Sequence, residues 1–357
     1  MSKPKFISIK ELFPSLYETV PGLIKGTYYS VTGATSTAKT KFTKFLFVSY
    51  AYSYCKKNNI PLKIVYFALE ESVDSFWISI KSDILYERYG ETLTYYQSEG
   101  YHDGLTPLIQ EHLDIIEPEI KDMKKYIEVI DYIHNPTGLY KKVKDVMNEV
   151  GKKVEGVEDK DENGNKWKSF DFVYDNPDTH VIIVTDHISM LSPEKNPISD
   201  VSTTHLAMAK WSEYVVRFVC KKYKCIVCSV HQQKMDGDNE TNVQQNPELL
   251  LPALSKFGDN LIIARDYEVV FGLFNPSRYK AFAKQYKGYN MEILNNKFRQ
   301  LCLLKHRAGK DNVTIPLLFK GEINYFKELP TPVQVDELDK VYSNFRQKPV
   351  NKFTTTI

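Results

Sequence analysis

The sequence predicts an α/β protein in which a mostly parallel central sheet lies between two layers of helices. Short apolar runs alternate with longer segments of helical period, and several of these runs are apolar at successive positions. Such continuous runs are typical of strands that are covered on both faces. The predicted strands are Thr27–Gly33, Lys63–Leu69, Tyr126–Asp131, His180–Asp186, Cys225–His231, Tyr267–Phe274 and Gln300–His306. The predicted helices are Ala38–Lys57, Val73–Tyr89, Gly138–Val150 and Thr203–Tyr223.

The composition is that of an ordinary folded protein. The chain has 357 residues, of which 42% are hydrophobic and 26% are charged, so extensive disorder is excluded. The sequence contains no apolar run of the roughly 18 residues that span a bilayer, and no secretion signal is recognisable, so we expect a cytoplasmic protein without a membrane partner. Five cysteines without regular spacing fit a reducing compartment. The net charge of +2 means that a nucleic acid would have to bind at a local basic patch.

Three parts of the chain are expected. Residues 1–25 form an N-terminal arm, residues 26–330 form the α/β domain, and residues 331–357 form a tail without a strong pattern. Within the domain, the charged stretch at about 151–178 is expected to be an irregular exposed loop. The apolar residues of the arm allow either docking on an adjacent subunit or packing on the same subunit. They are Phe6, Ile7, Ile9, Leu12 and Phe13.

A phosphate-binding loop is predicted at the turn between the first strand and the first helix. The segment reads GATSTAKT and comprises Gly33, Ala34, Thr35, Ser36, Thr37, Ala38, Lys39 and Thr40. Backbone N–H groups of such a loop surround a phosphate, the lysine reaches the β- and γ-phosphates, and the last hydroxyl holds Mg²⁺. The pattern asks for glycine where this chain has Ala38, and alanine is acceptable there if it keeps a negative φ. The other interpretation of the segment is a plain turn of small residues.

Two acidic positions follow predicted strands. In an open α/β sheet, ligands bind at the carboxyl ends of the strands, so Glu70 is expected beside the phosphate loop, where it could activate a water molecule. The alternative role for Glu70 is to cap the following helix, and Glu71 is expected either in solvent or paired with a base. Asp186 ends another strand and is expected to hold Mg²⁺ directly or through water.

A third strand ends at His231, followed by two glutamines. A polar side chain here could contact the γ-phosphate or the attacking water. The spacing of Cys225, Cys228 and His231 also allows a zinc site, but odd spacing on a strand points the two cysteines to opposite faces, which disfavours a shared ion.

These motifs resemble those of the ATPase domain of DnaB-type hexameric replicative DNA helicases, a branch of the RecA-like P-loop ATPases, with the phage members the most similar. The resemblance extends from about Gly26 to Glu328 and lacks the family's usual N-terminal domain. The matching blocks are GATSTAKT (33–40), VYFALEES (65–72), YIEVIDYIHNPTGLYKKVKDVM (126–147), VIIVTDHISML (181–191), IVCSVHQQK (226–234), DYEVVFGLF (266–274), CLLKHRAGK (302–310) and LLFKGEINYF (317–326).

The resemblance implies a RecA-like fold with antiparallel strands near the C-terminus, and ATP and Mg²⁺ as cofactors. Glu70 resembles the family's catalytic glutamate, and Asp186 its metal-associated aspartate. His231 stands at the sensor position, where the family usually has glutamine. Lys305 and Arg307 resemble the pair that enters the ATP site of a neighbouring subunit; otherwise they form a solvated basic edge.

If Lys305 and Arg307 act as a basic finger in the site of a neighbouring subunit, a ring-shaped homo-oligomer follows, which is hexameric by analogy with the family. Single-stranded DNA is expected at two central loops, Ser192–Ser202 and Lys234–Pro247, with Lys195 as the better phosphate contact because the second loop is rich in acids. A primase or a loading protein would be a further partner, and for a phage protein the compartment would be the host cytoplasm.

Three functions are compatible with these residues. The first is an ATP-dependent DNA helicase or translocase that acts in replication. The second is a nucleotide-dependent DNA-binding ATPase that does not unwind, similar to a recombinase or a loader. The third is a degenerate relative that binds ATP in order to assemble and scarcely hydrolyses it, which the alanine at position 38 favours.

Overall fold

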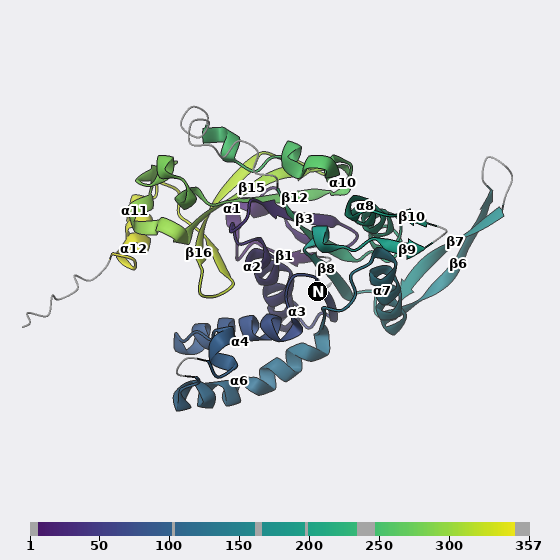
Figure 1. The fold of residues 1–357 in the computed structure, drawn as a ribbon, viewed down its shortest axis with the longest axis horizontal. Helices are drawn as coiled ribbons and strands as arrows, with labels where there is room; N and C mark the ends of the chain where they lie inside the picture. Colours follow the sequence, from purple (N-terminus) through teal and green to yellow (C-terminus); the bar gives the residue numbers. More distant parts are fainter. Residues whose placement is uncertain (1–5, 102–103, 161–165, 197–198, 234–246, 347–357) are drawn as a thin grey trace, which may run out of the picture.

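The computed structural model describes residues 6–101, 104–160, 166–196, 199–233 and 247–346. Among these residues nine strands form one sheet, in the order β17-β16-β15-β12-β3-β11-β8-β4-β5 (Figure 1). The strands from β12 to β5 are parallel, and β15, β16 and β17 extend the sheet in antiparallel fashion. The predicted α/β class and the C-terminal antiparallel strands are therefore confirmed. The strands are β3 (Tyr28–Gly33), β4 (Leu62–Ala68), β5 (Ile127–Ile130), β8 (His180–Asp186), β11 (Ile226–Gln232), β12 (Val269–Phe274), β15 (Phe298–His306), β16 (Val313–Lys320) and β17 (Tyr325–Glu328).

Helices cover both faces of this sheet. One face packs on α2, α3, α4 and α6 and the other on α7, α8 and α10, so two separate apolar cores lie on either side of the strands. No helix of the described residues is both long and apolar enough to cross a membrane. The principal helices are α2 (Lys39–Thr43), the π-helical η1 (Lys44–Tyr50), α3 (Ala51–Lys57), α4 (Val73–Tyr89), α6 (Pro107–Tyr126), α7 (Pro136–Val150), α8 (Thr204–Tyr214), the π-helical η3 (Val215–Cys220) and α10 (Leu261–Asp266).

The structure confirms the predicted reason for the continuous apolar runs, which is that these strands are buried on both faces. In β8, Ile182 and Val184 belong to the core under α2 and α3, whereas Val181 and Ile183 belong to the core under α7 and α8. All four side chains are at most 1% exposed. Successive side chains of a strand point to opposite faces, so a strand between two helical layers has to be apolar at every position.

The N-terminal segment packs on its own chain. Ile7, Ile9 and Phe13 are at most 1% exposed and belong to the core under α2 and α3. The Phe13 ring stacks on that of Phe42 in α2, with 6.0 Å between ring centroids. Of the two roles open to these apolar residues, packing on the same subunit is therefore the one that the structure supports.

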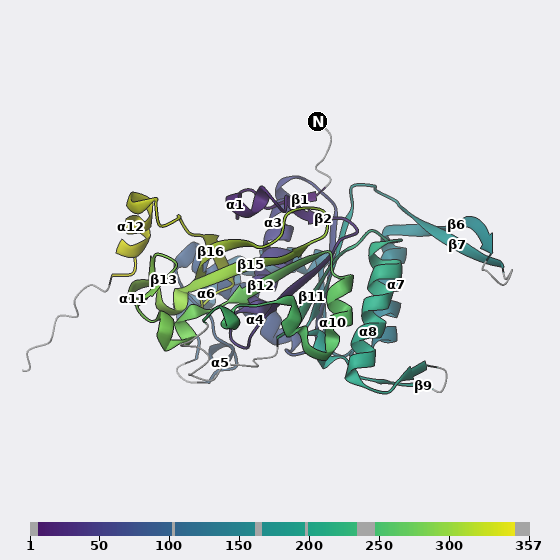
Figure 2. The ribbon, with the colours of Figure 1, turned by 90° about the horizontal axis from the view of Figure 1, so that it is seen from above.

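The charged stretch after α7 is a β-hairpin, so the expectation of an irregular loop at about 151–178 is wrong. Strands β6 (Gly151–Lys160) and β7 (Lys166–Tyr174) pair with each other and project from the body of the protein (Figures 1 and 2). Phe170 and Phe172 at the base pack against the ring of Tyr223. The strands of a projecting hairpin contact little of the core, so they can carry charged residues and lack the apolar pattern by which strands are recognised. The alternating aromatic residues of β7 are the one sequence signal of a strand here.

The residues after Pro330 begin with an ordered helix, α12 (Val335–Ser343), although they lack a strong sequence pattern. Leu338 and Tyr342 are buried in a third apolar cluster beside β16, and the Tyr342 hydroxyl accepts a hydrogen bond from the backbone N–H of Asn290 at 2.9 Å. The smaller elements are β1 (Phe6–Ser8), α1 (Pro14–Tyr17), β2 (Gly22–Ile24), α5 (Tyr95–Ser98), β9 (Glu194–Asn196), β10 (Ser199–Val201), β13 (Gln285–Tyr286), β14 (Tyr289–Asn290) and α11 (Met291–Leu294).

Candidate nucleotide site

The predicted phosphate loop joins the carboxyl end of β3 to the start of α2, at the centre of the sheet. Gly33 opens the loop with a φ of +155°, and a Cβ at this position would lie 2.5 Å from the carbonyl oxygen of Leu273. Only glycine allows this close approach of β3 to β12. The backbone therefore has the strand, turn and helix arrangement that a phosphate-binding loop requires.

Ala38 has a positive φ, although alanine would be acceptable at this position of the loop only with a negative φ. Its φ is +74° and its ψ is 34°, which is the left-handed region. The methyl group then crowds the following carbonyl oxygen, at a cost of roughly 1–2 kcal/mol. Glycine is free of that cost, which explains physically why the pattern asks for it here.

Lys39 is the first residue of α2, and its side chain folds back over the loop. It is 8% exposed, and its Nζ donates a hydrogen bond of 2.9 Å to the carbonyl oxygen of Ala34. Burial lowers the pKa of Lys39 to about 8, against the opposing effect of the negative charges of Asp186 and Glu70. A bound polyphosphate would add negative charge beside this ammonium group and would favour its charged form.

Asp186 and Thr40 meet beside the lysine. The Thr40 hydroxyl donates to Oδ1 of Asp186 at 3.3 Å, and the Tyr66 hydroxyl donates to Oδ2 at 2.5 Å. Asp186 is 2% exposed, and this burial raises the pKa of its carboxyl group. A hydroxyl and a buried carboxylate are oxygen donors of the kind that Mg²⁺ prefers, so these two residues fit the predicted metal role.

The adjacent acids Glu70 and Glu71 have different surroundings. The cap of α4 is Ser72, whose Oγ accepts the N–H of Ser75 at 3.1 Å, so helix capping is not the role of Glu70. Glu70 is exposed just beyond β4, next to the end of β8, where the N–H of Leu69 donates to the Asp186 carbonyl at 2.7 Å. Glu71 instead accepts from the buried Nζ of Lys44 at 2.7 Å, so of its two expected roles the ion pair is the one observed.

His231 lies beneath the loop rather than at its surface. The ring is 3% exposed and stacks on Phe257 with 4.7 Å between centroids, and neither ring nitrogen has a hydrogen-bond partner among the described residues. Burial and the positive charges of His187 and Lys39 lower the pKa of His231 to about 4, so the ring is neutral at pH 7. Its neighbour Gln232 contacts the loop directly, because its Nε2 donates to Oγ1 of Thr35 at 2.8 Å.

Two cysteines at and near the start of β11 lie on opposite faces of the sheet, as their odd spacing predicts. Cys225 belongs to the core under α7 and α8, and Cys228 to the core under α2 and α3. Among the described residues no group of three histidine, cysteine or acidic side chains is arranged to hold a metal ion.

The predicted basic finger lies at the other end of the strands. Nζ of Lys305 donates to the carbonyl oxygens of Ala264 and Arg265 at 2.8 Å each, and Nη2 of Arg307 donates to that of Arg265 at 2.8 Å. These carbonyls belong to the last turn of α10, where the helix dipole favours cations. The backbone N–H of Arg307 donates to the carbonyl oxygen of Glu268 at 2.9 Å, and the N–H of Glu268 donates to that of Tyr28 at 2.8 Å. Arg307 therefore lies at the level of Tyr28, and about 15 Å of strand separates it from Gly33.

Two arginines that sequence reasoning missed hold the loop from below and from the side. Nε of the buried Arg299 donates to the Thr37 carbonyl oxygen at 3.2 Å, and Nη1 of the exposed Arg278 donates to the Thr35 carbonyl oxygen. No local signal marks either residue, because β15 and the turn after β12 reach the loop only through the tertiary fold.

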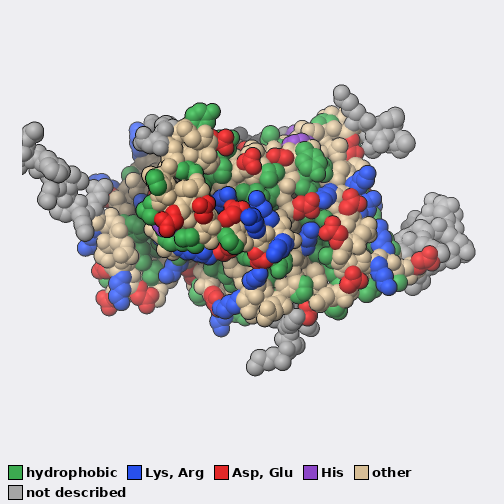
Figure 3. Space-filling view, turned by 90° about the horizontal axis from the view of Figure 1, so that it is seen from below, with side chains coloured by type: hydrophobic (Ala, Val, Ile, Leu, Met, Phe, Trp, Pro, Cys, Tyr) green, Lys and Arg blue, Asp and Glu red, His purple; other side chains and the backbone are tan. Residues whose placement is uncertain are grey.

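Of the two expected DNA-binding loops, the first is only partly described and residues 234–246 of the second lie outside the described residues. Lys195 lies in β9, which pairs with β10. Figure 3 views the molecule from the side of α4 and α6, where lysine, arginine and acidic side chains are interspersed on the described surface. A polyanion therefore finds no single-sign surface on the described part of this face.

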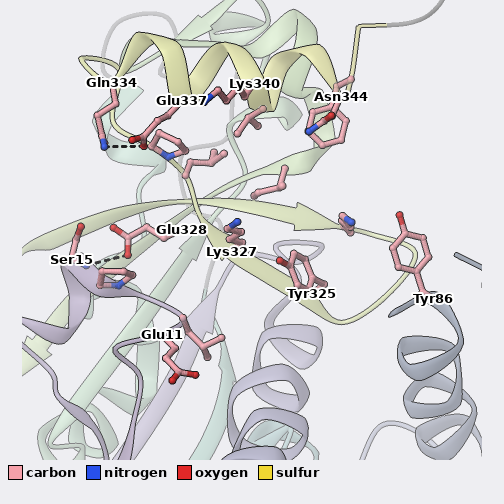
Figure 4. A pocket seen from close by; sticks show the side chains of 18 residues that line it. Glu11, Ser15, Tyr86, Tyr325, Lys327, Glu328, Gln334, Glu337, Lys340 and Asn344 are labelled. Atoms are coloured by element: carbon pink, nitrogen blue, oxygen red, sulfur yellow. Dashed lines mark hydrogen bonds between the residues drawn. The ribbon is translucent and has the colours of Figure 1, made fainter. Parts of the chain in front are cut away.

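A cavity of about 800 Å³ lies between the N-terminal segment, the β16–β17 strands and α12 (Figure 4). Its charges are balanced, and none of the predicted site residues lines it. Two hydrogen bonds cross its walls, from the Ser15 N–H to Glu328 at 3.1 Å and from Gln334 to Glu337 at 3.0 Å. The acidic residues that line it are Glu11, Glu328 and Glu337, and the basic ones are Lys320, Lys327 and Lys340.

Comparison with protein families and with curated proteins yields no match. Solved structures do match. The chain is similar to a structure described as an ATPase domain, with 15% identity, a TM-score of 0.60, and 91% of this chain and 93% of that chain covered. It is also similar to a DnaB-like replicative helicase whose structure was described with its interactions with primase, with 14% identity and a TM-score of 0.58. That alignment covers 92% of this chain but only 64% of the other.

At such identities the likeness concerns the fold. Together with the parallel sheet and the loop between β3 and α2, it confirms the resemblance at that level: the chain has the RecA-like fold of the ATPase domains of DnaB-like helicases.

Proposed function

We propose that this protein is an ATP-dependent DNA translocase or helicase that works as a ring-shaped oligomer, with a role in DNA replication. One observation carries the proposal. Lys39, Thr40 and Asp186 gather at the carboxyl ends of the strands, whereas Lys305 and Arg307 stand at the opposite ends, about 15 Å away along the sheet. The basic pair is out of reach of its own phosphate loop, so it would have to serve the loop of a neighbouring copy.

The phosphate end would bind the nucleotide and start the reaction. Lys39 would leave the Ala34 carbonyl and bind the β- and γ-phosphates, and Thr40 and Asp186 would hold Mg²⁺. When bound, the ion neutralises charge on the phosphates. Glu70 would take a proton from the attacking water while the water oxygen bonds to the γ-phosphorus and the bond from that phosphorus to the bridging oxygen breaks, which releases ADP and phosphate.

The neighbouring copy would complete the site. The guanidinium of Arg307 would approach the γ-phosphate and stabilise the charge of the transition state, an effect worth roughly 10³–10⁵ in rate in other phosphoryl-transfer enzymes. Within one subunit, both ring nitrogens of His231 are buried without a hydrogen-bond partner among the described residues. These free nitrogens support the sensor role that the resemblance implies, in which the ring would move towards the nucleotide and form a hydrogen bond to the γ-phosphate or its water.

A second function is favoured by one feature, the left-handed Ala38. A strained loop that binds phosphates less well would suit a protein that uses ATP chiefly to assemble. Turnover by Ala38→Gly discriminates the two functions: a large increase would indicate an impaired loop, whereas unchanged turnover would show that the loop already functions.

The proposed function is tested by measuring ATP turnover and strand separation on the same preparation. We expect single-stranded DNA to stimulate turnover and a forked duplex to be unwound, and we expect Lys39→Ala to abolish both. Stimulated turnover without strand separation would favour a DNA-binding ATPase that does not unwind. The absence of ATP turnover in every condition would contradict the proposal.

The assembly can be measured independently. Mass measurement with and without ATP and single-stranded DNA should reveal an oligomer that forms or closes when both are present. A primase or a loading protein is proposed as a further partner, supported by the primase interactions reported for the similar DnaB-like helicase.

A further inference from the structure

A turn beside the phosphate loop carries an arginine that neither the loop motif nor the basic finger includes. Strand β12 ends next to β3, with Leu273 paired to Gly33, and the turn Pro276–Arg278 follows at once. Nη1 of Arg278 donates to the carbonyl oxygen of Thr35 within the loop. Arg278 therefore belongs to the same end of the sheet and the same subunit as Lys39, unlike Arg307.

The turn that carries Arg278 is fixed. Oδ1 of Asn275 accepts hydrogen bonds from the backbone N–H and the hydroxyl of Ser277, at 3.2 and 2.7 Å. Nδ2 of Asn275 donates to Oδ1 of Asn296 at 3.1 Å, and the same oxygen accepts Nη2 of Arg299 at 3.0 Å. The turn and the phosphate loop are thus held by one continuous network, which keeps the backbone of Arg278 in place while its side chain is exposed.

The two arginines differ in what they can do. Arg299 is 2% exposed, donates to the carbonyl oxygens of Asn296, Phe298 and Thr37, and lies over the Phe319 ring at 4.4 Å, so its role is to support the loop. Arg278 is exposed at the rim of the loop. Its guanidinium presents five N–H donors in a fork that suits phosphate oxygens, so the group that holds Thr35 can also bind an anion.

We propose that Arg278 is a nucleotide-binding residue that acts within its own subunit: it holds the Thr35 carbonyl in the empty loop and binds phosphate oxygens of a nucleoside triphosphate in the filled one. A phosphate carries negative charge and can accept two parallel N–H bonds from one guanidinium, whereas the carbonyl is neutral and offers one oxygen, so the guanidinium exchanges the carbonyl for the phosphate. Lys39 would exchange its partner in the same way, because its Nζ also donates to a carbonyl oxygen of the loop, that of Ala34. This inference rests on the proposed function in one respect, that the loop binds a nucleoside triphosphate.

The test measures binding rather than turnover. Dissociation constants for MgATP and for inorganic tripolyphosphate are obtained by competition with a fluorescent ATP analogue, for the unmodified chain, Arg278→Ala, Arg278→Lys and Arg217→Ala. Arg217 is a matched exposed arginine, paired with Glu213 on α8 and η3. We expect Arg278→Ala to weaken both ligands by about 10- to 100-fold. Arg278→Lys should recover part of the loss, and Arg217→Ala should bind normally.

The outcomes separate the two proposals. Unchanged affinity in Arg278→Ala, or a loss for ATP without a loss for tripolyphosphate, would overturn the phosphate role while the proposed function stands. A loss that appears only in assembled rings, and not at dilutions where the chain is monomeric, would overturn the claim that Arg278 acts within its own subunit. Failure of the unmodified chain to bind either ligand would overturn both proposals. Thermal unfolding without nucleotide should be similar for all variants, and a large drop confined to Arg278→Ala would indicate a structural role instead.

Discussion

The two ends of the central strands are built differently. At the carboxyl ends, Lys39 and Asp186 are buried; Lys39 donates a hydrogen bond to the Ala34 carbonyl of the loop, and Asp186 accepts hydrogen bonds from Thr40 and Tyr66. At the amino ends, Arg307 is exposed and held through the carbonyl oxygen of Arg265. The phosphate loop with Lys39 at one end of the sheet and the exposed guanidinium of Arg307 at the other would be the two halves of a site that a second copy completes.

Removal of Arg307, the exposed half of the proposed site, should have the largest effect on ATP turnover. We expect Arg307→Ala to reduce ATP turnover by about 10³-fold or more, because the guanidinium stabilises the charge that develops on the γ-phosphate. Nucleotide affinity of the isolated subunit should be unchanged, since the residue belongs to the other end of the sheet. Steady-state turnover and equilibrium binding measure the two effects. The matched control is Lys310→Ala, an exposed residue of the same turn, and an equal loss in both variants would contradict a specific role for Arg307.

Removal of the proposed base, Glu70, from the phosphate-loop end should have a somewhat smaller effect on ATP turnover. Glu70→Gln keeps the shape of the side chain but cannot accept a proton, so turnover should fall by about 10²–10⁴-fold while ATP binding is retained. Glu71→Gln is the informative comparison, because Glu71 pairs with Lys44 and takes no part in the proposed reaction. Turnover close to that of the unmodified chain in Glu70→Gln would remove the base assignment.

A substitution away from both ends of the central strands should alter the free energy of unfolding without altering ATP turnover. Asp83 of α4 accepts hydrogen bonds from the backbone and side chain of Asn324, at 2.7 and 2.9 Å, and burial raises its pKa to about 6 against the opposing positive charges of Lys44 and Lys41. The folded state therefore binds this proton more tightly than the unfolded state. The resulting stabilisation is complete below pH 3.8, the ordinary value, and is lost as the pH rises through about 6.

In the variant Asp83→Asn the side chain at this position cannot ionise, so the variant should not lose stability as the pH rises through about 6. Relative to the unmodified chain, its free energy of unfolding should improve by up to about 3 kcal/mol between acidic and neutral pH. Urea unfolding at several pH values measures the difference. A difference between the two proteins that is independent of pH would contradict the assignment.

The smallest effect is expected within the phosphate loop itself. Ala38→Gly removes the left-handed strain of roughly 1–2 kcal/mol, but glycine also gives the unfolded chain about 0.4–1 kcal/mol of additional entropy. The net gain in unfolding free energy should be about 0.5–1 kcal/mol. Chemical denaturation measures it, and a clear destabilisation would show that the surrounding loop has adapted to the methyl group.

Much of the buried end could be predicted from the sequence, and less of the rest. Strands covered on both faces and the GATSTAKT turn are local signals, and they placed Lys39, Thr40 and Asp186 together. The hairpin β6–β7 was missed because its strands are charged, although Phe170, Phe172 and Tyr174 alternate as a strand requires. Arg278 and Arg299 were missed because their contacts join segments more than 240 residues apart in the chain.

The central claim is that one catalytic site is shared between two copies, and mixing inactive variants tests it most directly. Subunits with Arg307→Ala keep Glu70, and subunits with Glu70→Gln keep Arg307, so a mixed ring contains some interfaces with both groups intact. Random assortment at equal amounts should restore about one interface in four and a corresponding share of ATP turnover. If no mixing ratio raises turnover above that of the separate variants, the two ends do not meet in one site and the account is wrong.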